Sequence, residues 1–213
     1  MKSRSRGFTI VELMVTLSIA ALILAIGAPS FNEFRRNNRL TGTANDFLGA
    51  VQTARTEAIK RQLQVSVCPS ANPNDASPTC TNGAFTGWIA FVDPDGNCVR
   101  NGAAVPDPMG GAATRETDDI NLVRAGGPIE TQVTVVSAGT CVSFAPTGFL
   151  QAVPGRVSST RTMFCDERGT ALQGGTNLSF AREIQVTNVG RSCITRLPAE
   201  LADASLGAAL DCP

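Results

Sequence analysis

The apolar residues of this chain are concentrated near its start, in a continuous stretch from Phe8 to Ala28. The stretch has 21 residues, most of them Leu, Ile, Val and Ala, and its one charged residue is Glu12. As a helix it would extend about 30 Å, which is the thickness of the hydrocarbon core of a bilayer. The pattern therefore predicts a membrane-crossing helix over residues 8–28.

Two ordinary explanations account for only part of this stretch. A secretory signal peptide has a shorter apolar run, followed by small residues at a cleavage site. Gly27 and Ala28 could serve as such a site, but Glu12 is out of place near the front of the run. A signal anchor explains the length and the basic residues before it. It does not explain a carboxylate inside the membrane, which is costly and usually functional.

Beyond the apolar stretch, residues 29–63 continue as an amphipathic helix. We expect Gly27 and Pro29 to interrupt the helix near the membrane surface, because proline removes a backbone donor and favours a kink. An apolar stripe with a spacing of three to five residues follows: Leu40, Ala44, Phe47, Val51, Ala54, Ala58 and Leu63. The basic residues of 35–39 suit either anionic lipid headgroups or a solvated helix face, and the sequence leaves both open.

After Leu63 the spacing changes to that of strands, and residues 64–213 are expected to form a β-rich domain. Strands are predicted at 64–68, 87–93, 132–137, 141–145, 160–165 and 183–188. Residues 103–116 are rich in Gly, Ala and Pro and are expected to form a loop. The Ala-rich tail, residues 197–213, is expected to hold one short helix.

The turn at Pro94–Asn97 has two interpretations. Asp93, Asp95 and Asn97 alternate like the first ligands of a calcium-binding loop. The bidentate glutamate that would close such a loop is missing, so the sequence favours a plain hairpin turn.

Composition removes several classes of chemistry. The chain has no histidine, so neither a Ser/His/Asp or Cys/His nucleophile system nor a His-ligated metal site can form. No other catalytic set is evident, and we expect no enzyme activity, no cofactor and no metal. Formal charge is zero. Without Lys2, Arg4 and Arg6 the remainder carries 15 basic and 18 acidic side chains, which does not suit a strongly basic nucleic-acid binder.

Seven cysteines, none in a C-x-x-C pair, lie between Cys68 and Cys212. Behind a membrane segment this distribution predicts disulfides in an oxidising compartment. We expect Cys68 to pair with Cys80 across a proline-rich loop, and Cys165 to pair with Cys193 on successive predicted strands. The remaining three cysteines cannot be assigned, and the odd count leaves at least one without a partner in the same chain.

The residues around the start of the apolar stretch resemble the processing site of type IV prepilins. A short basic leader, residues 1–7, ends in Gly7 and is followed by Phe8, with Glu12 as the fifth residue of the mature chain. The resemblance implies cleavage between Gly7 and Phe8 by a prepilin peptidase and N-methylation of Phe8. Cleavage there leaves the apolar helix intact, so that it can later form the core of a filament.

Glu12 has a physical role in such a filament. When helices pack together, the free amine of Phe8 becomes a buried cation, and an unpaired carboxylate in the same medium is expensive. We therefore predict that Glu12 pairs with the Phe8 amine of a neighbouring subunit.

The rest of the chain is similar to the GspH/FimT group of minor pilins. The motifs that carry this resemblance are 54–58 leading into a Val-x-Val-Cys strand, the strand 87–93, 144–148, 165–169, and Arg182 with 189–191. They cover nearly the whole chain. The implied fold is α+β: a long N-terminal helix, transmembrane in its first half, packed on a C-terminal antiparallel β-rich domain. The several cysteines are closer to FimU- or FimT-type pilus subunits than to the GspH pseudopilin.

A DNA-binding role is a further implication of the resemblance, but the motif is incomplete. FimT-like DNA-uptake pilins carry a C-terminal Gly-Arg-x-Arg motif that is implicated in gripping phosphates. In this chain Gly190 and Arg191 are followed by Ser192 and Cys193, so the second arginine is absent. Possible DNA contacts are Arg182, Arg191 and Arg196, and the sequence favours solvated arginines on an edge strand.

The sequence as a whole predicts a minor pilin that enters a type IV pilus near its tip and primes or caps assembly. Alternatives are a DNA-binding minor pilin for natural transformation and a GspH-type pseudopilin of a type II secretion system. The expected partners are other pilins and minor pilins, the prepilin peptidase and the inner membrane. We expect a single-pass inner-membrane precursor with its domain in the periplasm, which then moves to the pilus at the cell surface.

Overall fold

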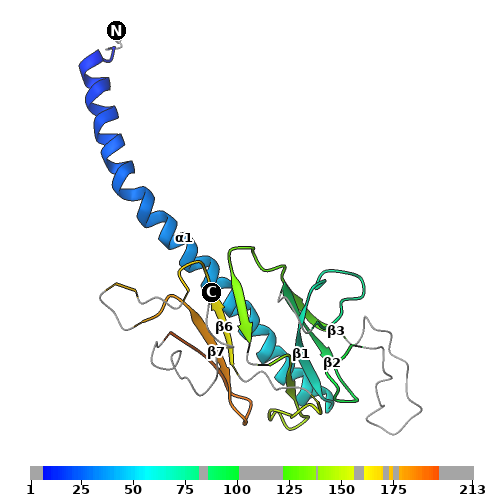
Figure 1. Ribbon diagram of the computed structural model, residues 1–213. Coiled ribbons are helices and arrows are strands. Elements are labelled where there is room, and N and C mark those ends of the chain that lie inside the picture. The colour runs from blue at the N-terminus through cyan, green and yellow to red at the C-terminus, as the bar shows by residue number, and fades with distance from the viewer. Residues whose placement is uncertain are drawn as a thin grey trace, which may run out of the picture. The chain divides into compact units, whose positions relative to one another are not determined.

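The computed structural model describes residues 7–81, 86–100, 122–137, 139–155, 161–169, 173–174 and 178–196. The chain divides into two compact units, Met1–Asn38 and Arg39–Pro213. Within the described residues one helix precedes a set of strands (Figure 1), and the fold is α+β as predicted. The elements are α1 (Ile10–Arg61), β1 (Val65–Ser70), β2 (Gly87–Val92), β3 (Leu122–Gly126), β4 (Thr134–Ser137), β5 (Val142–Phe144), β6 (Arg161–Cys165), β7 (Arg182–Val186) and β8 (Ser192–Thr195).

Helix α1 has a capped start and a defined end. The backbone N–H of Glu12 donates to Thr9 Oγ1 at 3.2 Å, so Thr9 caps the first turn. The helix ends at Arg61, where Gln62 adopts a left-handed backbone with φ of 55°. Between these points α1 runs through Gly27 and Pro29, so the predicted interruption there is wrong. A proline removes only one backbone donor, and the loss of that hydrogen bond does not end the helix here.

In the second unit, α1 buries one stripe of small and apolar side chains. The fully or nearly fully buried residues recur every three or four positions: Leu40, Ala44, Phe47, Ala50, Val51, Ala54 and Ala58. This spacing places them on one helix face. The alanines let backbone elements approach closely, while Phe47 fills the space between them.

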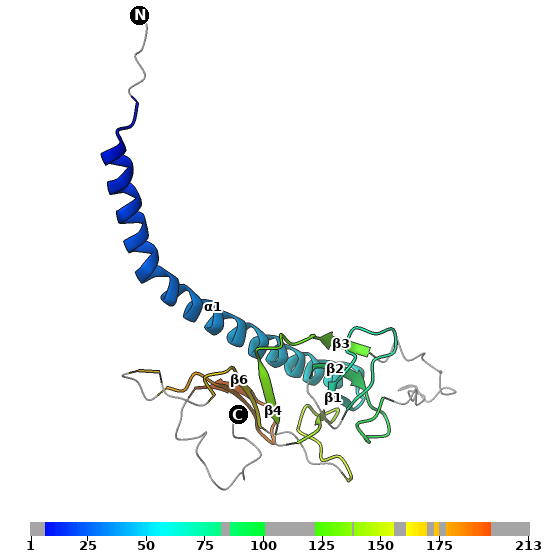
Figure 2. The same ribbon diagram turned by 45° about the horizontal axis from the view of Figure 1, so that its top comes forward.

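The strands form two antiparallel four-stranded sheets, which we call sheet A and sheet B. Sheet A has the order β3-β2-β1-β5, and sheet B has the order β4-β6-β7-β8. In the register of sheet A, Val67 lies opposite Ala90 and Val142. In sheet B, Ile184 lies opposite Ile194 and Thr162. Figures 1 and 2 show the second half of α1 lying along both sheets.

Phe47 joins the helix to both sheets. Its ring lies 5.4 Å from that of Trp88 on β2, at an interplanar angle of 83°, and 5.6 Å from that of Phe164 on β6. Edge-to-face aromatic pairs of this kind stabilise a core beyond the area they bury. One core cluster therefore contains residues from α1, sheet A and sheet B.

Polar contacts add to this packing at both ends of the part of α1 that belongs to the second unit. Arg39 forms an ion pair with Glu130 and a hydrogen bond with Gln132, in the segment between β3 and β4. Arg55 donates to the carbonyl of Gly148, just after β5, at 2.9 Å. Both arginines thus fix segments that leave sheet A. The ion pair between Arg39 and Glu130 adds little to stability, because Glu130 is exposed.

The predicted strands at 64–68, 87–93, 132–137, 141–145, 160–165 and 183–188 correspond to β1, β2, β4, β5, β6 and β7. The sequence did not predict β3 and β8. Strand β3 carries Arg124 followed by the two small residues Ala125 and Gly126, and β8 has four residues in a hairpin with β7. The predicted loop at 103–116 and the predicted helix in the tail, 197–213, lie outside the described residues.

The disulfides agree with one predicted pair and contradict the other. Cys68 pairs with Cys80, as the sequence indicated, and Cys98 pairs with Cys141. Cys193 is free and exposed. Cys165 is bonded to a partner outside the described part of the chain.

The predicted pair of Cys165 and Cys193 is therefore wrong, and the strand order explains why. Cys165 is on β6 and Cys193 is on β8, and β7 lies between them. Strands two places apart are separated by about 10 Å, whereas a disulfide needs Cα atoms about 4.4–6.8 Å apart.

The chain turns directly after β2, where the backbone N–H of Gly96 donates to the carbonyl of Asp93 at 3.1 Å. Strand β3 begins only at Leu122, so this turn does not close the short hairpin that the sequence favoured. The buried carboxylate of Asp93 accepts hydrogen bonds from Ser66 Oγ at 2.5 Å and from the backbone N–H of Cys98 at 2.9 Å. The pKa of Asp93 is raised, and the largest cause is the burial of its carboxyl group. The described residues hold no group of three or more His, Cys, Asp or Glu side chains that could bind a metal ion.

Candidate functional site: the apolar helix and the arginines of sheet B

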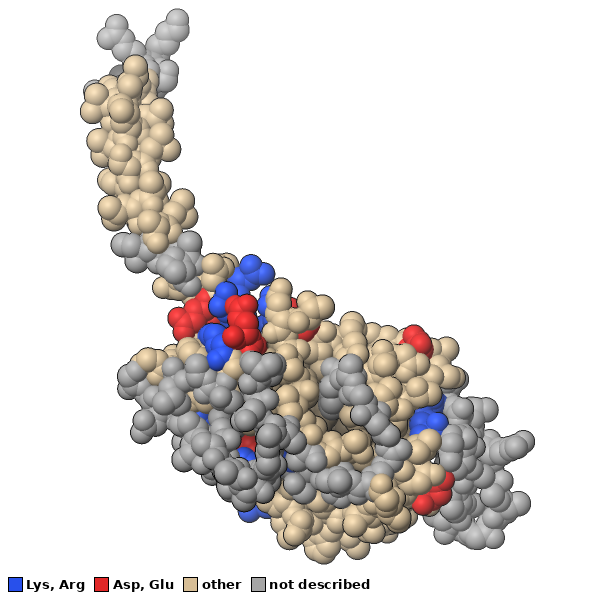
Figure 3. All heavy atoms as spheres, viewed as in Figure 1, with Lys and Arg blue, Asp and Glu red and all other residues tan. Residues whose placement is uncertain are grey.

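The first candidate site is the N-terminal part of α1, which leaves its apolar side chains exposed. Its most apolar 18-residue window has a mean hydropathy of 2.4 and no residue buried within the structure. Figure 3 shows this segment as an uncharged surface on the face drawn. Exposed large apolar side chains include Phe8, Ile10, Val11, Leu13, Met14, Val15, Leu17, Ile19, Leu22, Ile23 and Leu24. By length and composition this part of α1 can cross a membrane.

Two hydroxyls inside this apolar segment are satisfied by the helix itself. Thr16 Oγ1 donates to the carbonyl of Leu13 at 2.9 Å, and Ser18 Oγ donates to that of Met14 at 2.8 Å. Neither residue needs a partner from outside the helix. Of the polar side chains in this segment, Glu12 is therefore the one that most needs a hydrogen-bond or ion-pair partner from another molecule.

Glu12 lies in the first turn of α1, where its carboxylate has one local function. A negative charge there interacts favourably with the partial positive charge of the helix N-terminus. The spacing of Thr9 and Glu12 is that of a capping box, Thr-x-x-Glu, and this signal was readable in the sequence but was missed. Among the described residues the Glu12 carboxylate forms no hydrogen bond or ion pair, so it is available to a group from another molecule.

The second candidate site consists of the arginines near the end of the described chain. The structure brings Arg182 and Arg196 together and separates Arg191 from them. Arg182 begins β7 and Arg196 follows β8, so both lie at the open end of the β7–β8 hairpin. Arg191 lies in the turn at the other end, five residues before Arg196 and therefore about 16 Å away along an extended strand. The three arginines, named together in the sequence as possible DNA contacts, therefore do not form one cluster in space.

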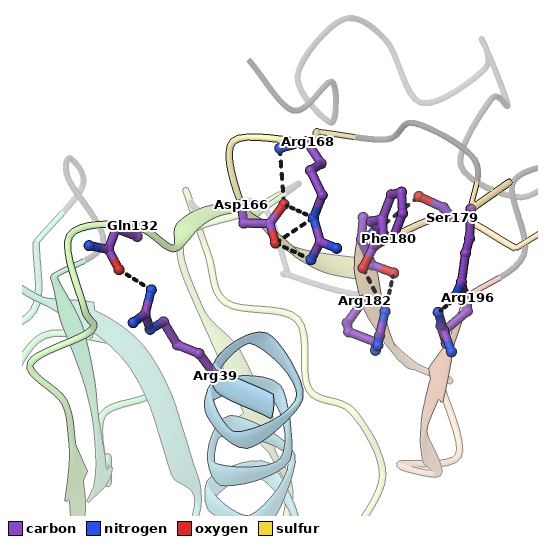
Figure 4. Close-up of polar contacts among 10 residues, drawn as sticks. Arg39, Gln132, Asp166, Arg168, Ser179, Phe180, Arg182 and Arg196 are labelled. Atoms are coloured by element: carbon purple, nitrogen blue, oxygen red, sulfur yellow. Dashed lines mark hydrogen bonds and ion pairs between the residues drawn. The ribbon is translucent and has the colours of Figure 1, made fainter. Parts of the chain in front are cut away.

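The environments of these arginines also differ. Arg182 is buried, with 5% of its surface exposed, and its Nη1 donates to the carbonyl of Phe180 at 2.6 Å (Figure 4). Burial, followed by repulsion from Arg196 and Arg168, lowers the pKa of Arg182 to about 10. Arg191 is exposed. Only Arg191 has the solvated position that the sequence analysis favoured for all three.

Arg168 belongs to the same end of sheet B, and sequence reasoning did not single it out. Its Nε donates to both carboxylate oxygens of Asp166 at 3.0 Å, and its guanidinium lies 4.0 Å from the centre of the Phe180 ring (Figure 4). Both contacts fix the orientation of the side chain. The Asp-x-Arg spacing at the end of β6 was the available signal.

Comparison with known proteins identifies the class and then the family. The prokaryotic N-terminal methylation motif matches residues 2–28, which defines the pilin-type N-terminus. The family of type II transport protein GspH matches residues 43–190, which is more than half of the chain, so the protein belongs to this family. It is a type IV minor pilin or pseudopilin of the GspH/FimT group.

Two curated relatives are similar over part of their length. A fimbrial protein of Dichelobacter nodosus is 28% identical over 111 residues, which are 52% of this chain and 65% of the relative. Prepilin peptidase-dependent protein D of Escherichia coli (strain K12) is 32% identical over 78 residues, which are 37% of this chain and 53% of the relative. The chain thus spans less than two thirds of each relative.

Two solved structures are also similar, both of the type IV minor pilin FimU of Pseudomonas aeruginosa PAO1. The crystal form in space group P21 has 18% sequence identity and a TM-score of 0.43, over 78% of this chain and 94% of FimU. The form in space group P65 has 18% sequence identity and a TM-score of 0.40, over 72% of this chain and 90% of FimU.

Proposed function

We propose that this protein is a minor subunit of a type IV pilus that enters the filament near its tip and primes assembly together with other minor pilins. The observation that carries the proposal is the N-terminal part of α1, whose apolar side chains are all exposed although the second unit has a complete core of its own. The apolar surface of such a helix has to be covered by lipid before assembly and by the helices of other subunits afterwards.

The proposal includes processing by a prepilin peptidase. Cleavage between Gly7 and Phe8 removes the basic leader and leaves the apolar helix whole, and Phe8 is then N-methylated. The basic leader favours a cytoplasmic N-terminus, by the positive-inside rule. The domain then lies in the periplasm, where the disulfides Cys68–Cys80 and Cys98–Cys141 are stable.

Glu12 is proposed as the assembly residue. It carries the only charge of the apolar stretch, and it has no ion-pair partner within the described residues. In a filament core its partner is the methylated amine of Phe8 on a neighbouring subunit. This pair compensates two charges that would be expensive to bury singly.

A pseudopilin of a type II secretion filament is the second candidate, and the description of the matching family favours it. A strain that lacks this protein separates the two functions. We expect loss or strong reduction of surface pili, measured by electron microscopy and by pilin in sheared fractions, with unchanged secretion of an exoprotein. Normal piliation with the exoprotein retained in the periplasm would support the pseudopilin and contradict the pilus function.

DNA binding is not proposed. Arg182 is buried and Arg191 is at the far end of the hairpin, so the arginines considered from the sequence present no joint surface to a duplex. No catalytic role is proposed either. The proposed activity consists of binding between subunits.

A further inference from the structure

Arg182 and Arg196 are cross-strand neighbours with the same charge. Glu183 lies opposite Thr195 in the register of β7 and β8, so the next positions outward bring Arg182 opposite Arg196. Side chains alternate along a strand, and both arginines therefore share the sheet face of Ile184 and Ile194, which lie opposite each other. Like charges directly opposite each other destabilise a sheet.

Burial makes this arrangement more costly. Arg182 is 5% exposed, and its Nη1 reaches only the neutral carbonyls of Phe180, at 2.6 Å, and Ala181, at 3.3 Å. Burial is the largest cause of the lowered pKa of Arg182, followed by repulsion from Arg196 and Arg168, while the charge of Asp166 partly opposes them. A buried cation without an anionic partner is unfavourable.

Two carboxylates of the described residues in this part of sheet B are already engaged. Asp166 binds Arg168 through both oxygens. Glu183 is turned to the opposite face of the sheet, where it forms an ion pair with Arg161. Within the described residues neither Arg182 nor Arg196 forms an ion pair with a carboxylate.

Arg196 also has a donor that the fold leaves unused. Its Nη2 donates to Gln173 Oε1 at 3.2 Å, whereas its Nε is buried and has no hydrogen-bond partner among the residues that the structure describes. Buried donors in native proteins nearly always have a partner, so an orphan donor indicates a missing acceptor. In Figure 4 Arg196 and Arg182 lie next to each other, and Arg168 is held nearby by Asp166 and Phe180.

We propose that Arg182 and Arg196 together bind a small oxyanion, such as inorganic phosphate or sulfate, at the open end of the β7–β8 hairpin. Guanidinium groups present several N–H donors in a fixed plane and suit tetrahedral oxyanions. The anion compensates the two like charges and accepts a hydrogen bond from Arg196 Nε. The burial of Arg182 excludes the phosphodiester of a DNA duplex, so the ligand is a free small anion.

Thermal unfolding of the full chain in detergent tests this site, with sodium phosphate compared against sodium chloride at equal ionic strength. At phosphate concentrations about ten times the dissociation constant, Tm is expected to rise by about 3 °C or more. Arg196→Gln removes half of the site at a partly exposed position. It should abolish the phosphate-dependent rise. In chloride its Tm should equal or exceed that of the wild type, because the like-charge pair is relieved.

Arg191→Gln is the matched control, since Arg191 is exposed at the other end of the same hairpin. It should retain the full phosphate-dependent rise. A short DNA duplex at the same phosphate concentration should give no rise that depends on Arg196. The proposal is overturned if phosphate and chloride give the same Tm, if Arg196→Gln keeps the rise, or if Arg196→Gln is less stable than the wild type in chloride.

Discussion

The guanidinium of Arg55 donates a hydrogen bond from Nε to the backbone carbonyl of Gly148 at 2.9 Å. Its Nη2 donates to the carbonyl of Val189 at 3.0 Å. One side chain of α1 thus holds the turn after β5, in sheet A, and the turn between β7 and β8, in sheet B. Gly148 and Gly190, with φ of 78° and 76°, let the two turns come close together.

Gly190→Ala is expected to destabilise the protein strongly. A Cβ at this position would lie 2.1 Å from the carbonyl oxygen of Gly148 and 2.9 Å from Arg55 Nε, so the two turns would have to separate. We expect a loss of about 3 kcal/mol or more in the free energy of unfolding, measured by denaturant titration of the full chain in detergent.

Gly155→Ala is the matched control for Gly190→Ala. Gly155 also has a positive φ, 73°, but nothing lies within 4 Å of its Cβ position. This variant should lose only about 1 kcal/mol, the cost of a left-handed backbone. Equal losses in the two variants would show that contact between the turns contributes nothing.

The disulfide assignment predicts that Cys193 is the reactive thiol of the native domain. Maleimide labelling without a reductant should modify wild-type protein, and Cys193→Ser should remove that labelling. Cys193→Ser should leave stability within about 0.5 kcal/mol, because Cys193 is exposed. Labelling that persists in Cys193→Ser would contradict the assignment.

Removal of the Cys68–Cys80 bridge should be much more severe than the loss of Cys193. The double variant Cys68→Ser, Cys80→Ser frees a loop closed over a sequence separation of 12, and chain entropy predicts a loss of about 3 kcal/mol. Denaturant titration beside Cys193→Ser measures the difference. An effect no larger than that of Cys193→Ser would mean that the loop is ordered without the bridge.

Asp93 gives a testable pH dependence. Burial raises its folded-state pKa above the ordinary value of 3.8, so the folded protein takes up this proton before the unfolded chain does. The wild type should therefore gain stability relative to Asp93→Asn as pH falls from 7 through the raised pKa towards 4. The measurement is denaturant titration of both proteins at each pH, and a difference that shrinks or stays constant with falling pH would contradict this sign.

The helix and most strands were predictable because their side-chain spacing is local. The spacing of Leu40, Ala44, Phe47 and Val51 defines a helix face before any partner is known, and all four are buried. The order of the strands in a sheet depends on contacts between residues far apart in the sequence. Cys165 and Cys193 lie on strands that are separated in space by β7, and no short-range pattern gives this order.

The same limit applies to the arginines of sheet B. Sequence spacing groups Arg182, Arg191 and Arg196, but the hairpin register places Arg191 at the opposite end. Burial of Arg182 depends on the packing of the whole sheet end, including Phe180 and Arg168. By contrast, Thr9 and Glu12 form a local capping motif and were predictable.

We propose that the exposed N-terminal part of α1 is a filament assembly element in which Glu12 pairs with the processed Phe8 amine. The most direct test compares wild type, Glu12→Ala and Glu33→Ala for cleavage before Phe8, by mass spectrometry, and for recovery in sheared pili. Glu33 is the control because it is an exposed carboxylate on the same helix, outside the apolar stretch. We predict that all three proteins are cleaved and that Glu12→Ala alone remains in the membrane. Incorporation of Glu12→Ala at the wild-type level would contradict the claim.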